Sequence, residues 1–536
     1  MKPRSVDVCD LKKEFTAENA ERRRGFLQKT SRRIDRLLFA KNFISLRSSA
    51  LSAVKSIVAA WIPMSQRRFT WVAVIALAFL AVAPLSVFAA KPPNIVVILA
   101  DDQCYRDFGF MGNLRVHTPN IDQLAAAAAR YPNGYVPMSV CRPSLATVLT
   151  GLYPHQHGIH FNHPPPGLAT MRKTMTADEY HAARAAADYL IENVPTLPRV
   201  LAQHGYVCLQ TGKHWEGSFQ TAGFTHGMTR GLPAERLGQV TGTRQQAGGE
   251  WVAHGNGDAG LVIGRETMQP IEDFVAEYAG RQPFFVWYAP FLPHIPFDAP
   301  QQFHDVYRGR KIPEHLRPYY AEIARFDETV GQLLDCLDRQ GVRDDTLIVF
   351  ASDNGFRPAE DNPHRQNRRS KLSQFEDGLR TPILLSWPGK IQPAEHPQLV
   401  GTVDLAPTIL AAAGLSAEIT PRMHGENLLP SAMGKEQLAD RPAFGAIYPN
   451  DAQSLGAPSR HVRGRWIRLG DYKLLIPGPA KDPISKSLFD VKHDPDETKN
   501  LIDKPQQAER ITQMTQLLDR WWPPGDDSDV TQPNRR

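Results

Sequence analysis

One cysteine stands immediately before a short helical pattern, in the stretch MSVCRPSLATVLTGLYPHQHG from Met138 to Gly158. Pro143 is typical of the first turn of a helix and Gly151 of its end, so Cys141 is expected at a helix N-terminus. Such a cysteine is either a small buried apolar residue or a nucleophile. The polar residues in the rest of the chain bear on this choice.

Polar side chains follow four of the apolar runs that predict strands. Five runs, at residues 94–103, 206–215, 283–294, 346–355 and 382–390, are continuously apolar at their centres. They alternate with helical patterns at 120–131, 177–194, 196–205, 320–341 and 404–414, which predicts an α/β domain with parallel strands buried on both faces. The first, second, third and fourth runs lead into Asp101 and Asp102, Lys213 and His214, His294, and Asp353 and Asn354. Because parallel strands share a carboxyl edge, these groups are expected to face one pocket.

Three carboxylates and an amide oxygen at one edge of a sheet would repel one another without a cation. An isolated Asp-Asp pair is typical of a solvated turn or a helix cap. Two acidic pairs after equivalent strands, Asp101–Asp102 and Asp353–Asn354, favour a metal site instead. All-oxygen ligands suit Ca²⁺, with Mg²⁺ the second choice, and the absence of clustered His or Cys argues against zinc.

Cationic side chains complement this acidic cluster. Lys213 and His294 follow two of the strands, and Lys371 lies in SKLSQFEDGLRTP. Each has an ordinary interpretation alone, as a surface charge or a loop residue. Together with a divalent cation, they are the groups that bind a tetrahedral oxyanion such as sulfate or phosphate.

These motifs, taken in order, resemble the type I sulfatases of the alkaline phosphatase superfamily. The resemblance runs from about Pro93 to the C-terminus and includes PNIVVILADDQ, VCRPSLATVLTGLYPHQHG, TGKHWEG, PFLPHIP, SDNG, SKLSQFEDGLRTPILLSWPG and LFDVKHDPDETKNL. It implies an alkaline-phosphatase-like α/β fold, with a large, mostly parallel central sheet flanked by helices. A smaller C-terminal α+β subdomain with an antiparallel sheet is expected after about Gly414.

The resemblance also implies a role for each site residue. Cys141 matches the cysteine that a formylglycine-generating enzyme converts to formylglycine, whose hydrate attacks sulfur. Lys213 and Lys371 match the lysines that hold the sulfate, and His294 matches the histidine at the leaving-group oxygen. The ligands expected for Ca²⁺ are Asp101, Asp102, Asp353 and Asn354, together with residue 141. The implied substrate is a sulfated small molecule or glycan.

Leu145 departs from the family pattern. It stands where the family has an arginine that stabilises formylglycine and is read by the converting enzyme. Arg142 lies one residue after Cys141 on the expected helix and points about 100° away from it, so it is not a simple substitute.

The order Lys213-His214-Trp215 is the second departure, since the family often has Lys-Trp-His. Adjacent residues of an extended segment face opposite ways, which puts the catalytic role of His214 in question. His157 and His226 are the alternative histidines.

Two alternatives to a sulfate ester hydrolase follow from these observations. The same pocket would hold phosphate, which keeps a phosphodiesterase or phosphonate hydrolase open. The Leu145 departure keeps open a non-catalytic relative that binds sulfated glycans.

The charge of the chain is concentrated before the folded part. Residues 1–68 carry 16 basic and 6 acidic residues, which leaves 46 basic and 50 acidic residues out of the totals of 62 and 56. The body is thus mildly acidic, and the formal charge of +6 is no evidence for nucleic-acid binding.

The uncharged stretch from Phe69 to Ala90 predicts export. Read from Met64, it forms a signal peptide at 64–90 with Val87-Phe88-Ala89 as the cleavage site, which makes residues 1–63 a basic extension from a start assigned too early. The alternative is a retained membrane anchor with a cytoplasmic tail. The expected domains are a catalytic domain at 91–414 and a C-terminal subdomain at 415–536, in the periplasm or outside the cell.

Overall fold

A computed structural model describes residues 91–231, 243–245, 248–253 and 259–530. The chain divides into two compact units, residues 1–91 and 92–536. The expected extension at 1–63 and signal peptide at 64–90 lie outside the described residues. Among the helices that are described, none combines the length and the apolar composition needed to cross a bilayer.

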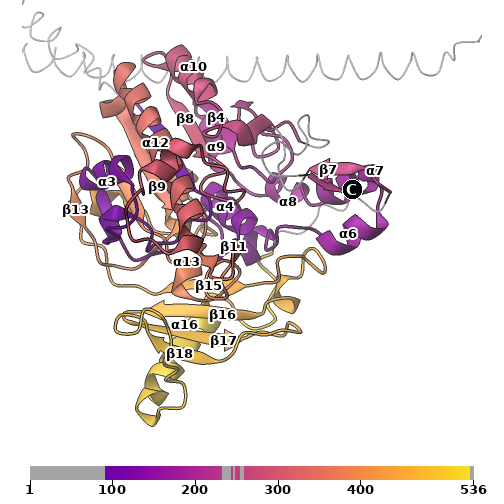
Figure 1. Ribbon diagram of the computed structural model, residues 1–536. Helices are drawn as coiled ribbons and strands as arrows, with labels where there is room; N and C mark the ends of the chain where they lie inside the picture. The colour runs from indigo at the N-terminus through magenta and orange to yellow at the C-terminus, as the bar shows by residue number, and fades with distance from the viewer. Residues whose placement is uncertain (1–90, 232–242, 246–247, 254–258, 531–536) are drawn as a thin grey trace, which may run out of the picture. The chain divides into compact units, whose positions relative to one another are not determined.

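A mixed, mostly parallel eight-stranded sheet forms the centre of residues 92–536, as the sequence predicts (Figure 1). Its spatial order is β13 (Ala394–Glu395), β2 (Ala129–Tyr131), β12 (Ile383–Ser386), β9 (Thr346–Ser352), β1 (Asn94–Ala100), β8 (Phe284–Ala289), β4 (Val207–Gly212) and β5 (His226–Gly227). The five strands from β9 to β5 run parallel, whereas β12 is antiparallel to both of its neighbours.

Both faces of the sheet are buried, which explains why its strands are continuously apolar. In β1, side chains alternate between two hydrophobic clusters: Ile95, Val97 and Leu99 enter one, and Val96, Ile98 and Ala100 enter the other. The first cluster includes α4 (Cys141–Thr150), α9 (Leu197–Gln203) and α14 (Leu405–Ala412). The second includes α3 (Pro119–Ala126), α10 (Gln269–Tyr278) and α12 (Arg317–Arg339).

Three local expectations were wrong. The helix expected at 120–131 ends at Ala126, and its last residues form β2. The helix expected at 177–194 is two helices, α7 (Ala177–Ala185) and α8 (Tyr189–Glu192). The run at 382–390 is a strand, but it is antiparallel rather than parallel. An alanine-rich or continuously apolar run does not specify where a helix breaks or which way a strand runs.

A four-stranded antiparallel sheet follows the large sheet in the chain, as expected for the C-terminal region (Figure 1, yellow). It consists of β15 (Ala443–Ile447), β16 (Gly464–Leu469), β17 (Tyr472–Pro477) and β18 (Ser487–Asp490). Met514 and Leu518 of α16 (Ala508–Trp521) pack against Ile467, Leu474 and Leu488 of this sheet.

Shorter elements complete the described chain. They are α5 (Pro154–His157), α6 (Leu168–Thr174), α11 (Gln301–Asp305), α13 (Glu376–Leu379), α15 (Leu429–Ala432), β3 (Gly134–Tyr135), β6 (Thr243–Gln245), β7 (Trp251–Ala253), β10 (Pro358–Ala359), β11 (Asn362–Gln366) and β14 (Val400–Gly401).

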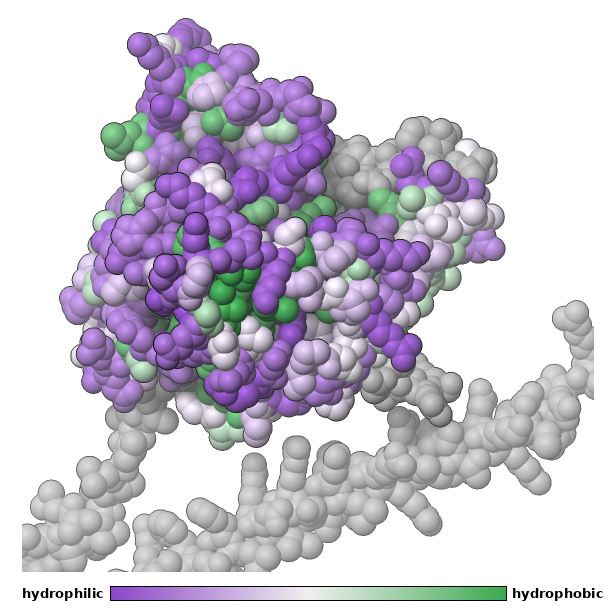
Figure 2. All heavy atoms as spheres, turned by 90° about the horizontal axis from the view of Figure 1, so that it is seen from below, coloured by the Kyte–Doolittle hydropathy of each residue, from purple (hydrophilic) through white to green (hydrophobic). Residues whose placement is uncertain are grey.

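The surface is mostly polar. The face in Figure 2 is largely hydrophilic, with hydrophobic side chains gathered in a hollow near its centre. Over the described ranges, Leu114 is the only large hydrophobic side chain that is exposed. The apolar residues of the chain are thus used in its cores rather than in an extended apolar surface.

Candidate active site

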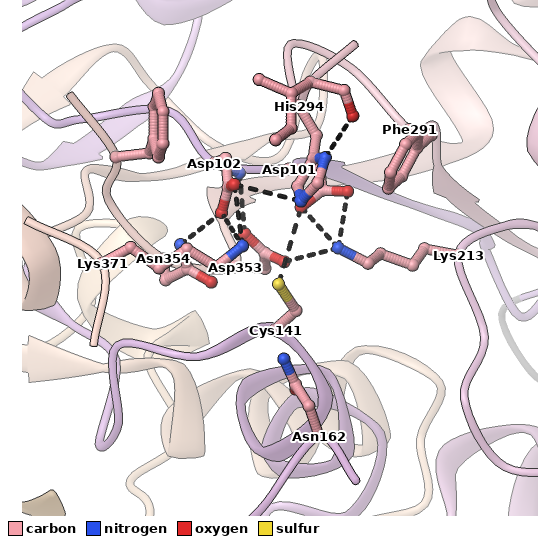
Figure 3. A network of polar contacts seen from close by, with 12 residues as sticks. Asp101, Asp102, Cys141, Asn162, Lys213, Phe291, His294, Asp353, Asn354 and Lys371 are labelled. Atoms are coloured by element: carbon pink, nitrogen blue, oxygen red, sulfur yellow. Dashed lines mark hydrogen bonds and ion pairs between the residues drawn. The ribbon is translucent and has the colours of Figure 1, made fainter. Parts of the chain in front are cut away.

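The predicted site residues meet at the carboxyl edge of four adjacent parallel strands, β9, β1, β8 and β4 (Figure 3). Asp101 and Asp102 directly follow β1, and Asp353 and Asn354 directly follow β9. Lys213 is the first residue after β4, and the loop after β8 carries His294. The sheet thus brings residues that lie far apart in the sequence into hydrogen-bond distance; Asp102 and Asp353, for example, are 251 positions apart.

A buried ion pair joins the ends of β1 and β4. The Nζ of Lys213 lies 2.7 Å from both carboxylate oxygens of Asp101, and each side chain is 3 % exposed. Burial favours the neutral amine, but the neighbouring Asp101 carboxylate outweighs it and holds the pKa of Lys213 above its usual value. Lys213 therefore remains a fixed positive charge beneath the pocket.

Asp102 is surrounded by three polar side chains from different parts of the chain. Its carboxylate accepts a hydrogen bond from Asn354 Nδ2 at 2.6 Å and one from Lys371 Nζ at 2.8 Å, and it lies 3.3 Å from His294 Nε2. Asp102 has a φ of 67° and Leu372, next to Lys371, has a φ of 66°. Side chains other than glycine rarely adopt this left-handed backbone, and such strain is concentrated at functional sites.

His294 directs one ring nitrogen at the acidic cluster. Its Nδ1 lies 2.6 Å from the carbonyl oxygen of Ile295, which can only accept, so Nδ1 carries the proton. Burial lowers the pKa of His294 well below its usual value, which leaves Nε2 unprotonated. An unprotonated Nε2 facing the Asp102 carboxylate places two acceptors side by side, an arrangement that needs a proton or a cation between them.

Two acceptor oxygens of the cluster lack hydrogen-bond donors. They are Asp353 Oδ2 and Asn354 Oδ1, both buried, and no described residue donates to them. Burial and the nearby Asp101 carboxylate raise the pKa of Asp353 well above its usual value. The ligand atoms of Asp101, Asp102, Cys141 and His294 lie within 4.8 Å of one another. This donor set, rich in carboxylate oxygens and with orphaned acceptors, fits a hard divalent cation such as Ca²⁺.

Cys141 is the first residue of α4, and its Sγ lies 3.9 Å from Asp101 Oδ1 (Figure 3). Its side chain is buried, and this burial raises the pKa of the thiol to about 12, against the opposing effect of Lys213 and Lys371. A thiol with such a pKa is protonated at neutral pH and is a poor nucleophile. The position of residue 141 is that expected of a reacting group. The unmodified thiol, which is protonated at neutral pH, is not suited to that role.

A cavity of about 210 Å³ opens onto these groups. Asp102, Cys141, Lys213, His294 and Lys371 line it together with Asn162, His163, Leu168, Trp215, Leu261, Phe291, Ile295, Phe356, Gln366, Leu372 and Asn450. Four of the five predicted catalytic residues, namely Cys141, Lys213, His294 and Lys371, are thus in the cavity wall.

His214 is the predicted catalytic residue that does not line the cavity. Its Nε2 lies 3.1 Å from the carbonyl oxygen of Ser218, while Lys213 and Trp215 on either side face the cavity. The extended backbone explains this alternation. His157, which contacts Thr147, and His226, which contacts Tyr278, are also absent from the cavity wall.

Leu145 and Arg142 do not supply a cation to residue 141. Leu145 is 4 % exposed and belongs to a hydrophobic cluster of the sheet. The Arg142 guanidinium makes two hydrogen bonds, of 2.6 and 2.7 Å, to the carboxylate of Glu216, and both side chains are buried. This ion pair connects the start of α4 to the segment that carries Lys213. The Glu216 carboxylate neutralises the positive charge of Arg142.

The sequence interpretation missed four polar residues of the cavity: Gln366 and Asn450, and, in the segment after α5, Asn162 and His163. Asn162 and His163 are largely buried, and His163 Nδ1 lies 3.2 Å from Arg184. The sequence feature that could have identified Asn162 and His163 is their position in the stretch HFNHPPP, shortly after the helix that begins at Cys141.

The fold and the site together define an α/β protein with a pocket lined by lysine, histidine and carboxylate side chains at the carboxyl edge of its sheet. The family model described as Sulfatase matches residues 93–415, and the model described as N-sulphoglucosamine sulphohydrolase, C-terminal, matches residues 369–522. The chain belongs to the sulfatase family and is a sulfuric ester hydrolase by class.

Similar proteins include arylsulfatase A of Bos taurus, which is 30 % identical over 77 % of this chain and 84 % of its own length. Human N-acetylgalactosamine-6-sulfatase is 29 % identical over 70 % of this chain and 72 % of its own length. Choline-sulfatase of Rhizobium meliloti (strain 1021) is 26 % identical over 77 % of this chain and 83 % of its own length.

A solved structure of BT4656 in complex with its substrate D-glucosamine-2-N,6-O-disulfate matches with a TM-score of 0.63 and 20 % identity. It covers 83 % of this chain and 100 % of that one. The structure of Ps i-CgsB with k-i-k-neocarrahexaose matches with a TM-score of 0.60 and 24 % identity, over 82 % and 95 % of the two chains. Both similarities confirm the fold.

Proposed function

We propose that this protein hydrolyses sulfate esters of a carbohydrate, with residue 141 as the nucleophile after its thiol has been converted to the aldehyde of formylglycine. The observation that carries the proposal is the place of Cys141. It lies in the cavity wall, 3.9 Å from Asp101, with Lys213 and Lys371 close enough to influence its pKa.

The charges of the chain suit a sulfate group bound over residue 141. Lys213 and Lys371 both line the cavity and are held in the charged state by Asp101 and Asp102. Two fixed ammonium groups stabilise the negative charge on the sulfate oxygens without having to reorganise. His294 lines the same cavity, and its Nε2 is placed to exchange a proton at the leaving oxygen.

The cluster of Asp101, Asp102, Asp353 and Asn354 would hold Ca²⁺. Asp353 Oδ2 and Asn354 Oδ1, which accept no hydrogen bond from a described residue, support this assignment, because a cation would satisfy both acceptors. A bound divalent ion would polarise an oxygen of the sulfate and lower the pKa of a hydroxyl on residue 141.

The carbohydrate part of the proposal draws on the similar proteins. One is named for its action on N-acetylgalactosamine-6-sulfate, and one solved structure holds a disulfated glucosamine. Trp215 and Phe291 line the cavity of this chain and offer flat apolar surfaces of the kind that pack against sugar rings.

Paired substrates test the reaction type. The purified protein is expected to release sulfate from an aryl sulfate and from sulfated monosaccharides faster than phosphate from the matched aryl phosphate. Cys141→Ala should abolish sulfate release, whereas Cys336→Ala, which removes a buried thiol of α12, should not. Faster phosphate release would favour a phosphodiesterase or phosphonate hydrolase. Sulfated-glycan binding without turnover would favour a non-catalytic relative.

The maturation partner we propose is a formylglycine-generating or related enzyme that accepts Leu145 four residues after Cys141. Protein from its own host and protein from a host whose converting enzyme requires arginine should differ in the fraction of aldehyde at residue 141. Equal and complete conversion of Cys141 in both hosts would show that Leu145 does not restrict which converting enzyme can act on this protein.

We also propose that the protein is exported, on the basis of the apolar segment at 69–90. N-terminal sequencing of the exported protein is expected to find a start directly after Ala89. A mature N-terminus before Ala89 would contradict the signal peptide and favour an anchor.

A further inference from the structure

The side chain of Asn162 lies directly beneath Cys141 (Figure 3). It comes from the loop after α5, is 8 % exposed and lines the cavity. Its Oδ1 accepts a hydrogen bond from the backbone N–H of Arg142 at 3.1 Å. Since an N–H can only donate, this contact identifies the oxygen of the amide and therefore the direction of its nitrogen.

The Nδ2 of Asn162 is consequently directed at Cys141, as Figure 3 shows. Throughout the described part of the chain, no carbonyl or carboxylate accepts a hydrogen bond from this nitrogen. The residue as a whole is largely buried and lines the cavity, and an amide donor that faces a cavity without a protein acceptor normally serves a bound water or ligand. The acceptor that faces Asn162 Nδ2 is therefore the side-chain atom of residue 141.

An ordinary interpretation of Asn162 is that it caps a helix. Val140, the residue before α4, makes no side-chain cap, and Asn162 Oδ1 satisfies one of the free N–H groups of the first turn instead. This role uses only the oxygen of the amide. It leaves the direction of Nδ2 unexplained, so capping and donation can be separated by experiment.

We propose that Asn162 is a catalytic residue whose Nδ2 donates a hydrogen bond to an oxygen of residue 141 once the thiol has been replaced by a hydrated aldehyde. The inference rests on the function proposed above. Addition of water across the aldehyde carbonyl gives two hydroxyl groups on one carbon, and a fixed donor stabilises the hydrate over the free aldehyde. Leu145 supplies no such donor, because its side chain is apolar and buried in the core.

Two variants distinguish donation from capping. Asn162→Asp keeps the oxygen that caps Arg142 N–H and removes the donor, whereas Asn162→Ala removes both. Asn427→Asp is the matched control, because Asn427 Oδ1 accepts from Leu429 N–H at α15, and Asn427 does not line the cavity.

The experiment measures three quantities on each protein from its own host. They are the midpoint of thermal unfolding, the rate at which an aminooxy reagent labels residue 141 per converted site, and kcat/KM for an aryl sulfate. We expect labelling to be several-fold faster in both Asn162 variants, because loss of the donor shifts the hydrate toward the free aldehyde. Their kcat/KM should fall about 10²-fold, whereas the unfolding midpoint should fall only in Asn162→Ala.

Labelling and turnover at the wild-type rate in both variants, with a lower unfolding midpoint in Asn162→Ala, would show that Asn162 is a helix cap only and would overturn the proposal. An aldehyde in the wild type with no effect of Asn162→Asp would overturn this inference alone. A wild-type protein without an aldehyde would overturn the proposed function together with it.

Discussion

Lys213 Nζ lies 2.7 Å from both carboxylate oxygens of Asp101, joining the ends of two strands separated in the sheet by β8. Lys371 and Asp102 form a second pair of the same kind, with Nζ 2.7 Å from Oδ1. The two lysines line the same cavity as Cys141. The acidic edge of the sheet thus holds two ammonium groups charged and directed toward one small space, which is the arrangement an anionic substrate requires.

Replacement of Lys371 should reduce catalysis more than it reduces stability. In Lys371→Met, one fixed positive charge is lost from the cavity, so kcat/KM for a sulfate ester is expected to fall about 10²- to 10³-fold. Steady-state kinetics measure the effect, with the exposed Lys390→Met as the control. A kcat/KM of Lys371→Met within a factor of two of the wild-type value would show that Lys371 does not contribute to catalysis.

Calcium should stabilise the protein through the acidic pairs. At a free Ca²⁺ concentration of about 100 times Kd, a single site adds about 2.7 kcal/mol to the free energy of unfolding. Without metal, Asp353→Asn is expected to be at least as stable as the wild type, because it removes a buried carboxylate that Asp101 repels. Calcium should stabilise this variant much less. Calorimetry with and without a chelator gives both values, and equal stabilisation of the two proteins would contradict the assignment of Asp353 as a ligand.

A buried lysine connects the C-terminal sheet to the segment that follows Lys371. Lys473 in β17 lies 3.0 Å from Glu376 and 2.6 Å from Glu497, and all three side chains are almost completely buried. Lys473→Met should reduce the free energy of unfolding by about 3 to 5 kcal/mol, because two buried carboxylates lose the lysine they share, and Glu376 is left with its longer ion pair with Arg468 at 3.5 Å. The exposed Lys492→Met, which breaks an ion pair with Asp471, should cost about 0.5 kcal/mol or less. Denaturant titration compares them, and equal losses would contradict the structural role of Lys473.

Asp188 should make stability depend on pH. Burial raises its pKa to about 7, against the opposing effect of Arg142. The folded protein therefore keeps a proton that the unfolded chain has already released, and stability falls as the pH rises from about 4 to 7, by at most about 1.4 kcal/mol per pH unit. Asp188→Asn is expected to make this slope shallower and to be more stable than the wild type at pH 8; Asp107, Asp327 and Glu497, whose pKa values burial also raises, still contribute to the slope. Asp503→Asn, at an exposed position, should keep the slope.

Thermal or chemical unfolding between pH 4 and pH 8 supplies the comparison for Asp188. If wild type and Asp188→Asn show the same dependence over this interval, another group is responsible for it.

The sequence predicted the strands and the carboxyl edge well, because continuous apolar runs report burial and the residues after each run are easily read. It did not predict that β12 is antiparallel or that the helix expected at 120–131 ends early at Ala126, since both depend on long-range pairing. Arg142 and Asn162 show the same limit within the site. The ion pair of Arg142 with Glu216 and the direction of Asn162 toward Cys141 depend on the tertiary fold, and the spacing of residues in the sequence carries no signal for either.

The departures at Leu145 and His214 have different structural consequences. Leu145 packs into the core and does not line the cavity, so it contributes no polar group to the surroundings of Cys141. His214 turns away from the cavity to Ser218, and Trp215 lines the cavity in its place. Of the histidines in the described residues, His294 and His163 line the cavity that holds Cys141, and they are therefore the candidate bases.

We propose that residue 141 reacts as an aldehyde hydrate. The most direct test is peptide mass spectrometry of residue 141 on several preparations from the native host, each assayed for sulfate release from one sulfate ester. Specific activity is expected to rise in proportion to the fraction of residue 141 carrying the aldehyde and to extrapolate to zero for the unmodified thiol. Full activity in protein whose Cys141 is an intact thiol would contradict it.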